Sequence, residues 1–110
     1  MELKETDDNT QLPARGPKEL TGKPDWSSFP FAEAENIVRV FEYGAKKYGA
    51  PFTYRKLVPV NELLSALIRH AVEIQNGNLI DEESGCYHAA HVCANALMLL
   101  SHKGTEKNLL

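Results

Sequence analysis

The stretch DEESGCYHAAHVCANALMLL, residues 81–100, decides the fold of this protein. From Ala89 onward it is apolar on nearly every side of a period of about 3.6 residues, which predicts a helix from about Ser84 to His102. A helix that is apolar most of the way round is typical of the centre of a domain. We therefore expect an all-α protein built around this segment.

Three polar side chains interrupt that helix: His88, His91 and Asn95. With a rotation of about 100° per residue, they fall within an arc of about 60°. An unpaired polar group in a core costs roughly 1–3 kcal/mol, so each of the three needs a partner. The stripe is interpreted as a hydrogen-bonded core network, as a polar surface at the end of a bundle, or as part of a metal or phosphate site.

Two more helices are predicted ahead of this one. Residues 31–48 place apolar side chains along one face, and Gly49 ends the pattern. Residues 61–76 are broadly apolar, with Asn61 as the expected N-cap and Gly77 as the stop. The sequence thus predicts a small helical bundle of three to four helices, without repeats or strands.

The connections and ends complete the expected domain organisation. Residues 50–59 contain two prolines and no clear period, so they are expected to form a loop that could reach over a site. The short link 77–83 favours antiparallel packing of the second and third helices. Residues 1–22 are polar and suggest a flexible N-terminal arm, 23–103 form the domain, and 104–110 are a tail.

Residues 25–31 (DWSSFPF) bring three aromatic side chains into seven residues. They are expected to form an apolar entry segment packed against the helices, or else a platform that stacks on bases.

A domain of this size buries only about 60–65% of its unfolded surface. We therefore expect a homo-oligomer, either a dimer or a tetramer.

Composition argues against several classes of function. The net charge is −3 and no lysine- or arginine-rich run occurs, which argues against non-specific nucleic-acid binding. No stretch of about 18 apolar residues occurs, and the first residues are polar, so we expect neither a membrane span nor secretion but a cytoplasmic protein. Cys86 and Cys93 lie about 10 Å apart if they share one helix, too far for a disulfide, and are expected to be reduced.

Further polar groups could join the stripe. His70 and Glu73 repeat its i, i+3 spacing, and both pairs would face one groove in an antiparallel arrangement. Asp81 and Glu83 either stabilise the start of the third helix or supply oxygen ligands for Mg²⁺ or Mn²⁺. Zinc held by His88, His91 and a cysteine is a weaker alternative, because the cysteines point away from these histidines on the helical wheel. No Walker pattern, His-Asp dipeptide or serine nucleophile stands out.

Four segments in this order and spacing resemble a known family. They are Lys23-Pro24, FEYGAKKYG at 41–49, ALIRHAVEIQNG at 66–77, and the stretch at 81–100. Together they resemble the phage and bacterial dATP/dGTP diphosphohydrolase domain, a relative of the MazG-like all-α nucleoside triphosphate pyrophosphatases. The resemblance implies an enzyme that hydrolyses dATP or dGTP to the monophosphate and pyrophosphate, with Mg²⁺ or Mn²⁺, in the cytoplasm (of the host, if a phage encodes it).

The resemblance also implies roles for particular residues. The wider superfamily holds metal with E-x-x-E and E-x-x-D pairs, whereas this chain has His70-x-x-Glu73 and His88-x-x-His91. Because imidazoles bind Mg²⁺ poorly, metal binding is assigned to Glu42, Asp81 and Glu83. The catalytic candidates are Glu83, His88 and His91. The candidates for substrate binding are Lys46, Lys47, Tyr48, Arg69, His70 and Asn95.

A different class of function remains open. The missing all-acid motif favours a non-catalytic helical module that binds a nucleotide or a partner. A helical oligomer with a hydrogen-bonded histidine core is a third, purely structural, interpretation.

Overall fold

A computed structural model describes residues 22–102 of the chain. The expected tail, and all but the last residue of the expected N-terminal arm, lie outside this range. Within it an isolated bridge between Ile80 and Tyr87 is the one β-type pairing and no strand forms, which confirms the all-α class. The elements are a 3₁₀ turn at Trp26–Ser28 and the helices α2 (Phe31–Tyr48), α3 (Tyr54–Leu57), α4 (Val60–Gln75) and α5 (His88–Ser101).

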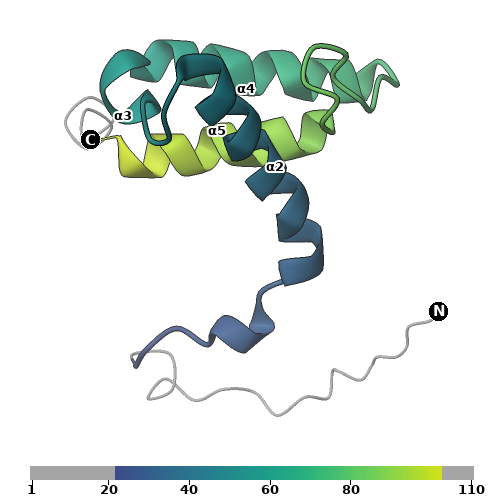
Figure 1. The fold of residues 1–110 in the computed structure, drawn as a ribbon. Helices are drawn as coiled ribbons and strands as arrows, with labels where there is room; N and C mark the ends of the chain where they lie inside the picture. The colour runs from purple at the N-terminus through teal and green to yellow at the C-terminus, as the bar shows by residue number, and fades with distance from the viewer. Residues whose placement is uncertain (1–21, 103–110) are drawn as a thin grey trace.

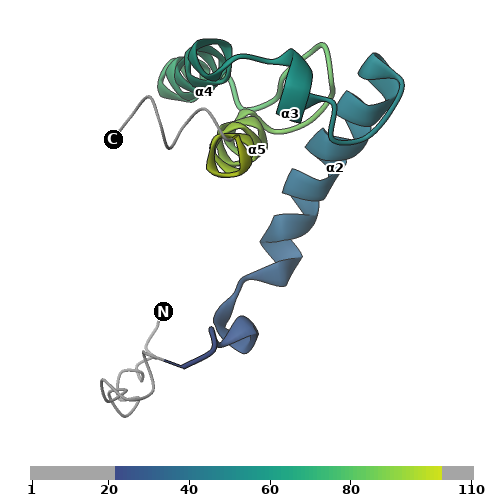
Figure 2. The same ribbon diagram turned by 90° about the vertical axis from the view of Figure 1, so that its left-hand side faces the viewer.

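The helices are arranged around α5. Helices α4 and α5 run antiparallel and side by side, as the short link predicted (Figure 1). Helix α2 crosses α5 with its C-terminal half, while its N-terminal half projects away from the pair (Figure 2). Helix α3 also packs against α5. The prediction that the helix at 84–102 is central is thereby confirmed.

A small apolar core joins α2 to α5. Among the described residues, the buried apolar side chains are Val40 of α2, Leu63 of α4, and Ala90 and Ala94 of α5. The two alanines are small enough to let α2 approach α5 closely, and Ala94 is fully buried. Four partly buried apolar residues pack around the α2–α5 contact, namely Ile37, Phe41, Cys86 and Met98.

The helix ends show where local sequence decides the structure. Gly49 and Gly77 follow α2 and α4 with φ of +87° and +89°, the left-handed conformation that glycine adopts without strain. Both predicted stops are confirmed. The predicted N-cap at Asn61 is wrong, because α4 already begins at Val60 after Pro59, whose ring fixes a φ compatible with a helix start.

Two further expectations need correction. The segment 50–59 contains the short helix α3 as well as loop. The third long helix begins at His88 rather than Ser84, because residues 79–88 close a small loop of their own. In it the amides of Asp81 and His88 donate to the carbonyls of Cys86 (2.8 Å) and Leu79 (2.8 Å).

This loop changes the context of two sequence features. Cys86 precedes α5, so it does not share a helix with Cys93, although both cysteines are free as expected. The acids at 81–83 lie outside the first turn of α5, so they do not cap it. Gly85 closes the loop with φ of +75°.

The aromatic segment at 25–31 does not pack against the helices of this chain. Trp26 is 70% exposed, and Phe29 and Phe31 contact each other edge to face at 5.1 Å between ring centroids. The expectation of a packed entry segment is therefore wrong for the single chain. None of the helices between residues 22 and 102 is long and apolar enough to cross a membrane.

Candidate functional site

A cavity of about 640 Å³ lies where the C-terminal half of α2 meets α3, α4 and α5. One part of its wall is apolar and largely aromatic. Arg55 stacks its guanidinium on Phe52 at 4.4 Å from the ring centroid, and Phe41 contacts Tyr54 edge to face at 5.7 Å. The apolar lining includes Phe41, Phe52, Tyr54, Val58, Leu63 and Met98.

The remaining wall carries charged and polar side chains from every long helix and from the 79–88 loop. It combines basic, acidic and imidazole groups within one concave surface. Such a mixture of an apolar surface and a few convergent polar groups is typical of small-molecule sites. The polar lining includes Tyr43, Lys47, Arg69, His70, Asp81, Glu83, His91 and Asn95.

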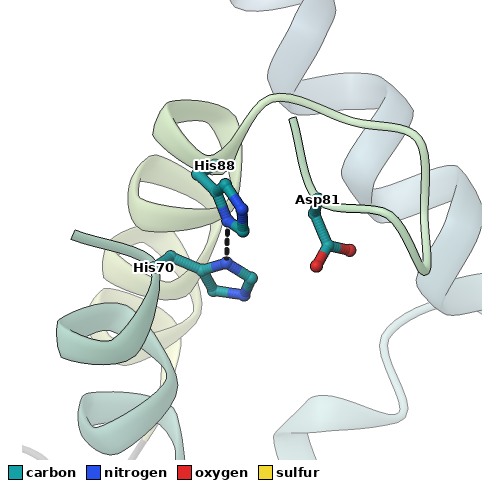
Figure 3. A group of neighbouring side chains, drawn as sticks. All are labelled: His70, Asp81 and His88. Carbon is teal, nitrogen blue, oxygen red and sulfur yellow. Dashed lines mark hydrogen bonds between the residues drawn. The ribbon is translucent and has the colours of Figure 1, made fainter. Parts of the chain in front are cut away.

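Three side chains next to this cavity point toward one another (Figure 3). His70 comes from α4, His88 from the first turn of α5, and Asp81 from the loop between them. The two Nδ1 atoms are 2.8 Å apart and share a hydrogen bond. One nitrogen from each imidazole and one carboxylate oxygen all lie within 4.8 Å of one another, a spacing at which the three residues could hold a metal ion. We call His70, Asp81 and His88 the His/Asp cluster.

Ser84 fixes the carboxylate of the cluster. Its backbone N–H and its hydroxyl both donate to Asp81 Oδ2, at 2.9 and 2.7 Å. The same hydroxyl oxygen lies 2.7 Å from His91 Nε2. Since the 79–88 loop is itself closed by backbone hydrogen bonds, Asp81 is held in position before any ligand arrives.

Burial favours the uncharged form of two of the imidazoles, His70 and His91. Desolvation lowers the pKa of His70 to about 4, and the neighbouring His91 and Arg69 act in the same direction. Desolvation also lowers the pKa of His91, against the attraction of Asp81. For Asp81 desolvation acts to raise the pKa, but the hydrogen bonds from Ser84 outweigh it, so the pKa lies below the usual value.

Glu83 forms a separate link between the loop and α2. Its carboxylate accepts a hydrogen bond from Tyr43 and pairs with Lys47 at 2.9 Å. These two bonds lower the pKa of Glu83, and the same contact raises the pKa of Lys47. Lys47 Nζ also lies 5.9 and 5.7 Å from the ring centroids of Tyr43 and Tyr48. The lysine is thus positioned at the cavity rather than free in solvent.

Most of the predicted substrate-binding residues meet at the cavity. Lys47, Tyr48, Arg69, His70 and Asn95 all line it. Asn95 is buried, and its amide donates to the carbonyl of His91 at 2.8 Å within α5.

Lys46 is not part of the cavity wall. It lies four residues after Glu42, and both lie on the side of α2 opposite the cavity-facing Gly44, because each differs from Gly44 by two residues, or about half a turn of the helix.

The predicted catalytic and metal residues are divided between two places. His91, Asp81 and Glu83 line the main cavity, whereas His88 lines a neighbouring one between Arg69, Glu73 and the loop. Within the described chain, the group suited to a metal contains Asp81 but neither Glu42 nor Glu83, and no cysteine. The residue roles themselves remain predictions.

Sequence reasoning missed two residues that organise the site. Ser84 bridges Asp81 and His91, and Tyr43 holds Glu83. A signal for Tyr43 was present, because it lies four residues before Lys47 and so on the same face of α2. No pattern indicated Ser84, since its role depends on the fold of the loop.

Comparison with known proteins identifies the family of this chain. The family model of the dATP/dGTP diphosphohydrolase N-terminal domain matches residues 13–109. A dATP/dGTP diphosphohydrolase of Salmonella phage PMBT28 is 38% identical over 66 residues, which cover 60% of this chain and 22% of that protein. The chain therefore spans less than a quarter of the length of this relative. No solved structure matches the chain. Because the family model covers most of the sequence, the chain belongs to the dATP/dGTP diphosphohydrolase N-terminal family.

Proposed function

We propose that this chain binds a purine deoxynucleoside triphosphate, dATP or dGTP, and hydrolyses it to the monophosphate and pyrophosphate. The observation that carries the proposal is the cavity, which has one aromatic wall and one charged wall, in a chain that belongs to this family. A purine offers flat apolar faces, which suit the aromatic wall formed by Phe41, Phe52 and Tyr54. The triphosphate is an anion, which suits the wall that carries Lys47 and Arg69.

The reaction requires an attacking water and a group that takes its proton. The water oxygen forms a bond to the α-phosphorus, and the bond from that phosphorus to the α,β-bridging oxygen breaks, so pyrophosphate leaves. We assign proton acceptance to His91, which lines the cavity and whose neutral imidazole has one ring nitrogen without hydrogen; because the Ser84 hydroxyl donates to Asp81 and accepts from His91 Nε2, that nitrogen is Nδ1. Glu83 is less suited to this role, because its carboxylate already binds Tyr43 and Lys47.

A divalent ion, Mg²⁺ or Mn²⁺, belongs to the proposed reaction because it neutralises the triphosphate. Mg²⁺ prefers a nearly octahedral set of oxygen ligands. The part of the chain described by the structure brings no three carboxylates together, so its side chains do not fit a resident Mg²⁺. In this proposal Mg²⁺ arrives as part of the substrate, bound to the phosphates.

Pyrophosphate release from dATP and dGTP, measured with Mg²⁺ and with Mn²⁺, tests the proposal. Lys47→Ala and Lys46→Ala form a matched pair, since the two lysines are adjacent on one helix and only Lys47 lines the cavity. Loss of a charge-assisted contact to phosphate is expected to lower kcat/KM roughly tenfold or more for Lys47→Ala, and not for Lys46→Ala. Equal effects of the two changes, or no release of pyrophosphate by the unaltered chain, would contradict hydrolysis at this cavity.

The absence of a three-carboxylate group among residues 22–102 favours one alternative, a module that binds the nucleotide without cleaving it. In that case dGTP raises the melting temperature of the chain while pyrophosphate release stays at the background level. Lys47→Ala then weakens the thermal shift and Lys46→Ala leaves it unchanged.

A further inference from the structure

The donor atoms of the His/Asp cluster are of a kind that selects among metals. Two of the three ligand atoms are imidazole nitrogens and the third is a carboxylate oxygen. Nitrogen donors suit divalent first-row transition ions, whereas Mg²⁺ takes oxygen. Two histidines with one carboxylate form a known type of ligand set for zinc.

The cluster has the burial and spacing of a ligand set. His70 and His88 are each only 5% exposed, although they belong to different helices. Their nitrogens are 2.8 Å apart. Ligands at about 2.0–2.1 Å from one ion lie roughly 3.3 Å from each other in a tetrahedron, so a small separation of the rings would admit the ion.

Neighbouring side chains hold the ligands as outer partners do in metal sites. Ser84 binds the carboxylate of Asp81 through two hydrogen bonds. His91 stacks on His70, with ring centroids 4.3 Å apart and planes inclined by 9°. Such outer contacts orient the ligand atoms and commonly change metal affinity about 10- to 100-fold when they are lost.

We infer that His70, Asp81 and His88 bind one divalent transition ion of the zinc, cobalt or manganese type, in preference to Mg²⁺. The three protein ligands leave room in the coordination shell for water or another small donor. Because Asp81 and His70 also line the main cavity, the ion would lie beside the polar wall proposed for the phosphates. The inference does not rest on hydrolysis, since metal binding is measured without nucleotide.

The test uses the full chain, stripped of metal with a chelator that is then removed. Cys86→Ser with Cys93→Ser serves as the background, because free thiols also bind zinc and cobalt. Titration with Co²⁺ is expected to produce the visible absorption of cobalt with a low coordination number. Zn²⁺ is expected to abolish this absorption by displacing the cobalt. Calorimetry and thermal unfolding should show binding and stabilisation by Zn²⁺ and Co²⁺, while Mg²⁺ at the same concentration gives neither.

Matched variants locate the ion. His88→Gln should weaken Co²⁺ and Zn²⁺ binding at least tenfold, whereas His102→Gln, at the one histidine outside the cluster region, should not. Asp81→Asn keeps the shape of the side chain and should also weaken binding, with the adjacent, exposed Glu82→Gln as its control. Circular dichroism identifies any variant that fails to fold. If His88→Gln does not fold, the comparison of Asp81→Asn with the unaltered chain tests the inference.

Two results would overturn the inference. One is the absence of Co²⁺ and Zn²⁺ binding by the background chain, which would leave a hydrogen-bonded histidine core. The other is equal binding by His88→Gln and His102→Gln, which would place the ion elsewhere. Neither result depends on pyrophosphate release, so failure of this inference and failure of the proposed function are distinguishable.

Discussion

At the scale of single residues, the unusual feature is a histidine that is buried without charge. His70 faces His88 and His91 on α5 and Asp81 on the loop, and Arg69 adjoins it on its own helix. Two of these neighbours are themselves histidines and one is a cation, so protonation of His70 is opposed from several sides. Its folded-state pKa of about 4 lies below the ordinary value of 6.5.

This shift predicts how the metal-free chain responds to acid. Between about pH 6.5 and pH 4 the unfolded state binds a proton at His70 that the folded state does not, so stability rises with pH and is lost on acidification. The free energy of unfolding in urea, measured with chelator, is expected to fall by roughly 2–3 kcal/mol through His70 over this range. His70→Gln should make the decline shallower, and His91, Asp81 and Glu83, whose pKa values are also lowered, contribute to what remains. An unchanged slope in His70→Gln would contradict the prediction.

Ser84 is predicted to act on both stability and metal affinity. Ser84→Ala removes the hydroxyl's hydrogen bond to the half-buried carboxylate of Asp81 and its contact with His91, while the backbone N–H bond to Asp81 stays; this should destabilise the chain by roughly 1–3 kcal/mol. It should also weaken Co²⁺ binding about 10-fold, because the ligand is held less firmly. Ser101→Ala, which removes a bond to the carbonyl of Met98 on the exposed side of α5, is the control and should leave metal binding unchanged.

At the scale of elements, the contact of α2 with α5 depends on a few small side chains. Val40 is 4% exposed against Ala90 and Ala94, while Val38 on the same helix is 54% exposed. Val40→Ala is expected to lower the free energy of unfolding by roughly 1–3 kcal/mol, since it leaves a void in a small core. Val38→Ala should change it much less. Denaturant unfolding of the two variants compares them, and similar losses would show that α2 does not dock as described.

The long helices could be predicted from the sequence because each has a clear pattern and a glycine stop. Gly49 and Gly77 end α2 and α4 where expected. The start of α5 could not be predicted, because the residues at 84–87 are compatible with a helix. They are held out of it by hydrogen bonds across the loop, such as that from His88 N to Leu79 O, and the periodicity of the helix carries no signal for these bonds.

The candidate site was predictable in part because several of its residues follow the helical pattern of the sequence. Helical spacing identified His88, His91 and Asn95 as one polar stripe, and all three are buried. It also predicted that His70 and His88 would face one groove, but the direct bond between their Nδ1 atoms could not be predicted, since that follows from how α4 and α5 pack. Glu42 was assigned by its charge alone, and helical geometry places it on the opposite side of α2 from the cavity.

At the scale of the whole molecule, α4 has two apolar faces, and one of them is uncovered in the single chain. Leu63 lies on the face that packs inward, while Leu64, Ile68 and Val72 form an exposed row at i, i+4 and i+8. Their exposed fractions are 43%, 53% and 50%. The buried apolar core in the described part of the chain is small for a domain that folds alone. A second copy of the chain is the expected partner, because a row spaced by four residues can pack against its own symmetry mate.

The homo-oligomer is tested by molar mass. Light scattering coupled to gel filtration should give a multiple of the chain mass, and Ile68→Lys should reduce it, because a buried unpaired charge opposes association. Leu79→Lys, at a similarly exposed position in the loop after α4, should keep the larger mass. A single-chain mass for the unaltered protein across a dilution series would contradict the prediction.

The bond between the two Nδ1 atoms makes two residues of one type chemically unequal. In the neutral pair only one of these nitrogens carries hydrogen, so His70 and His88 occupy opposite tautomers. Nitrogen-15 spectra of the metal-free chain should therefore resolve two distinct imidazole patterns. An ion that engages both Nδ1 atoms must first move that hydrogen to the far nitrogen of its ring. Metal uptake at neutral pH then becomes a tautomer exchange rather than a net release of a proton from this pair, and its rate depends on how readily water reaches two rings that are each 5% exposed.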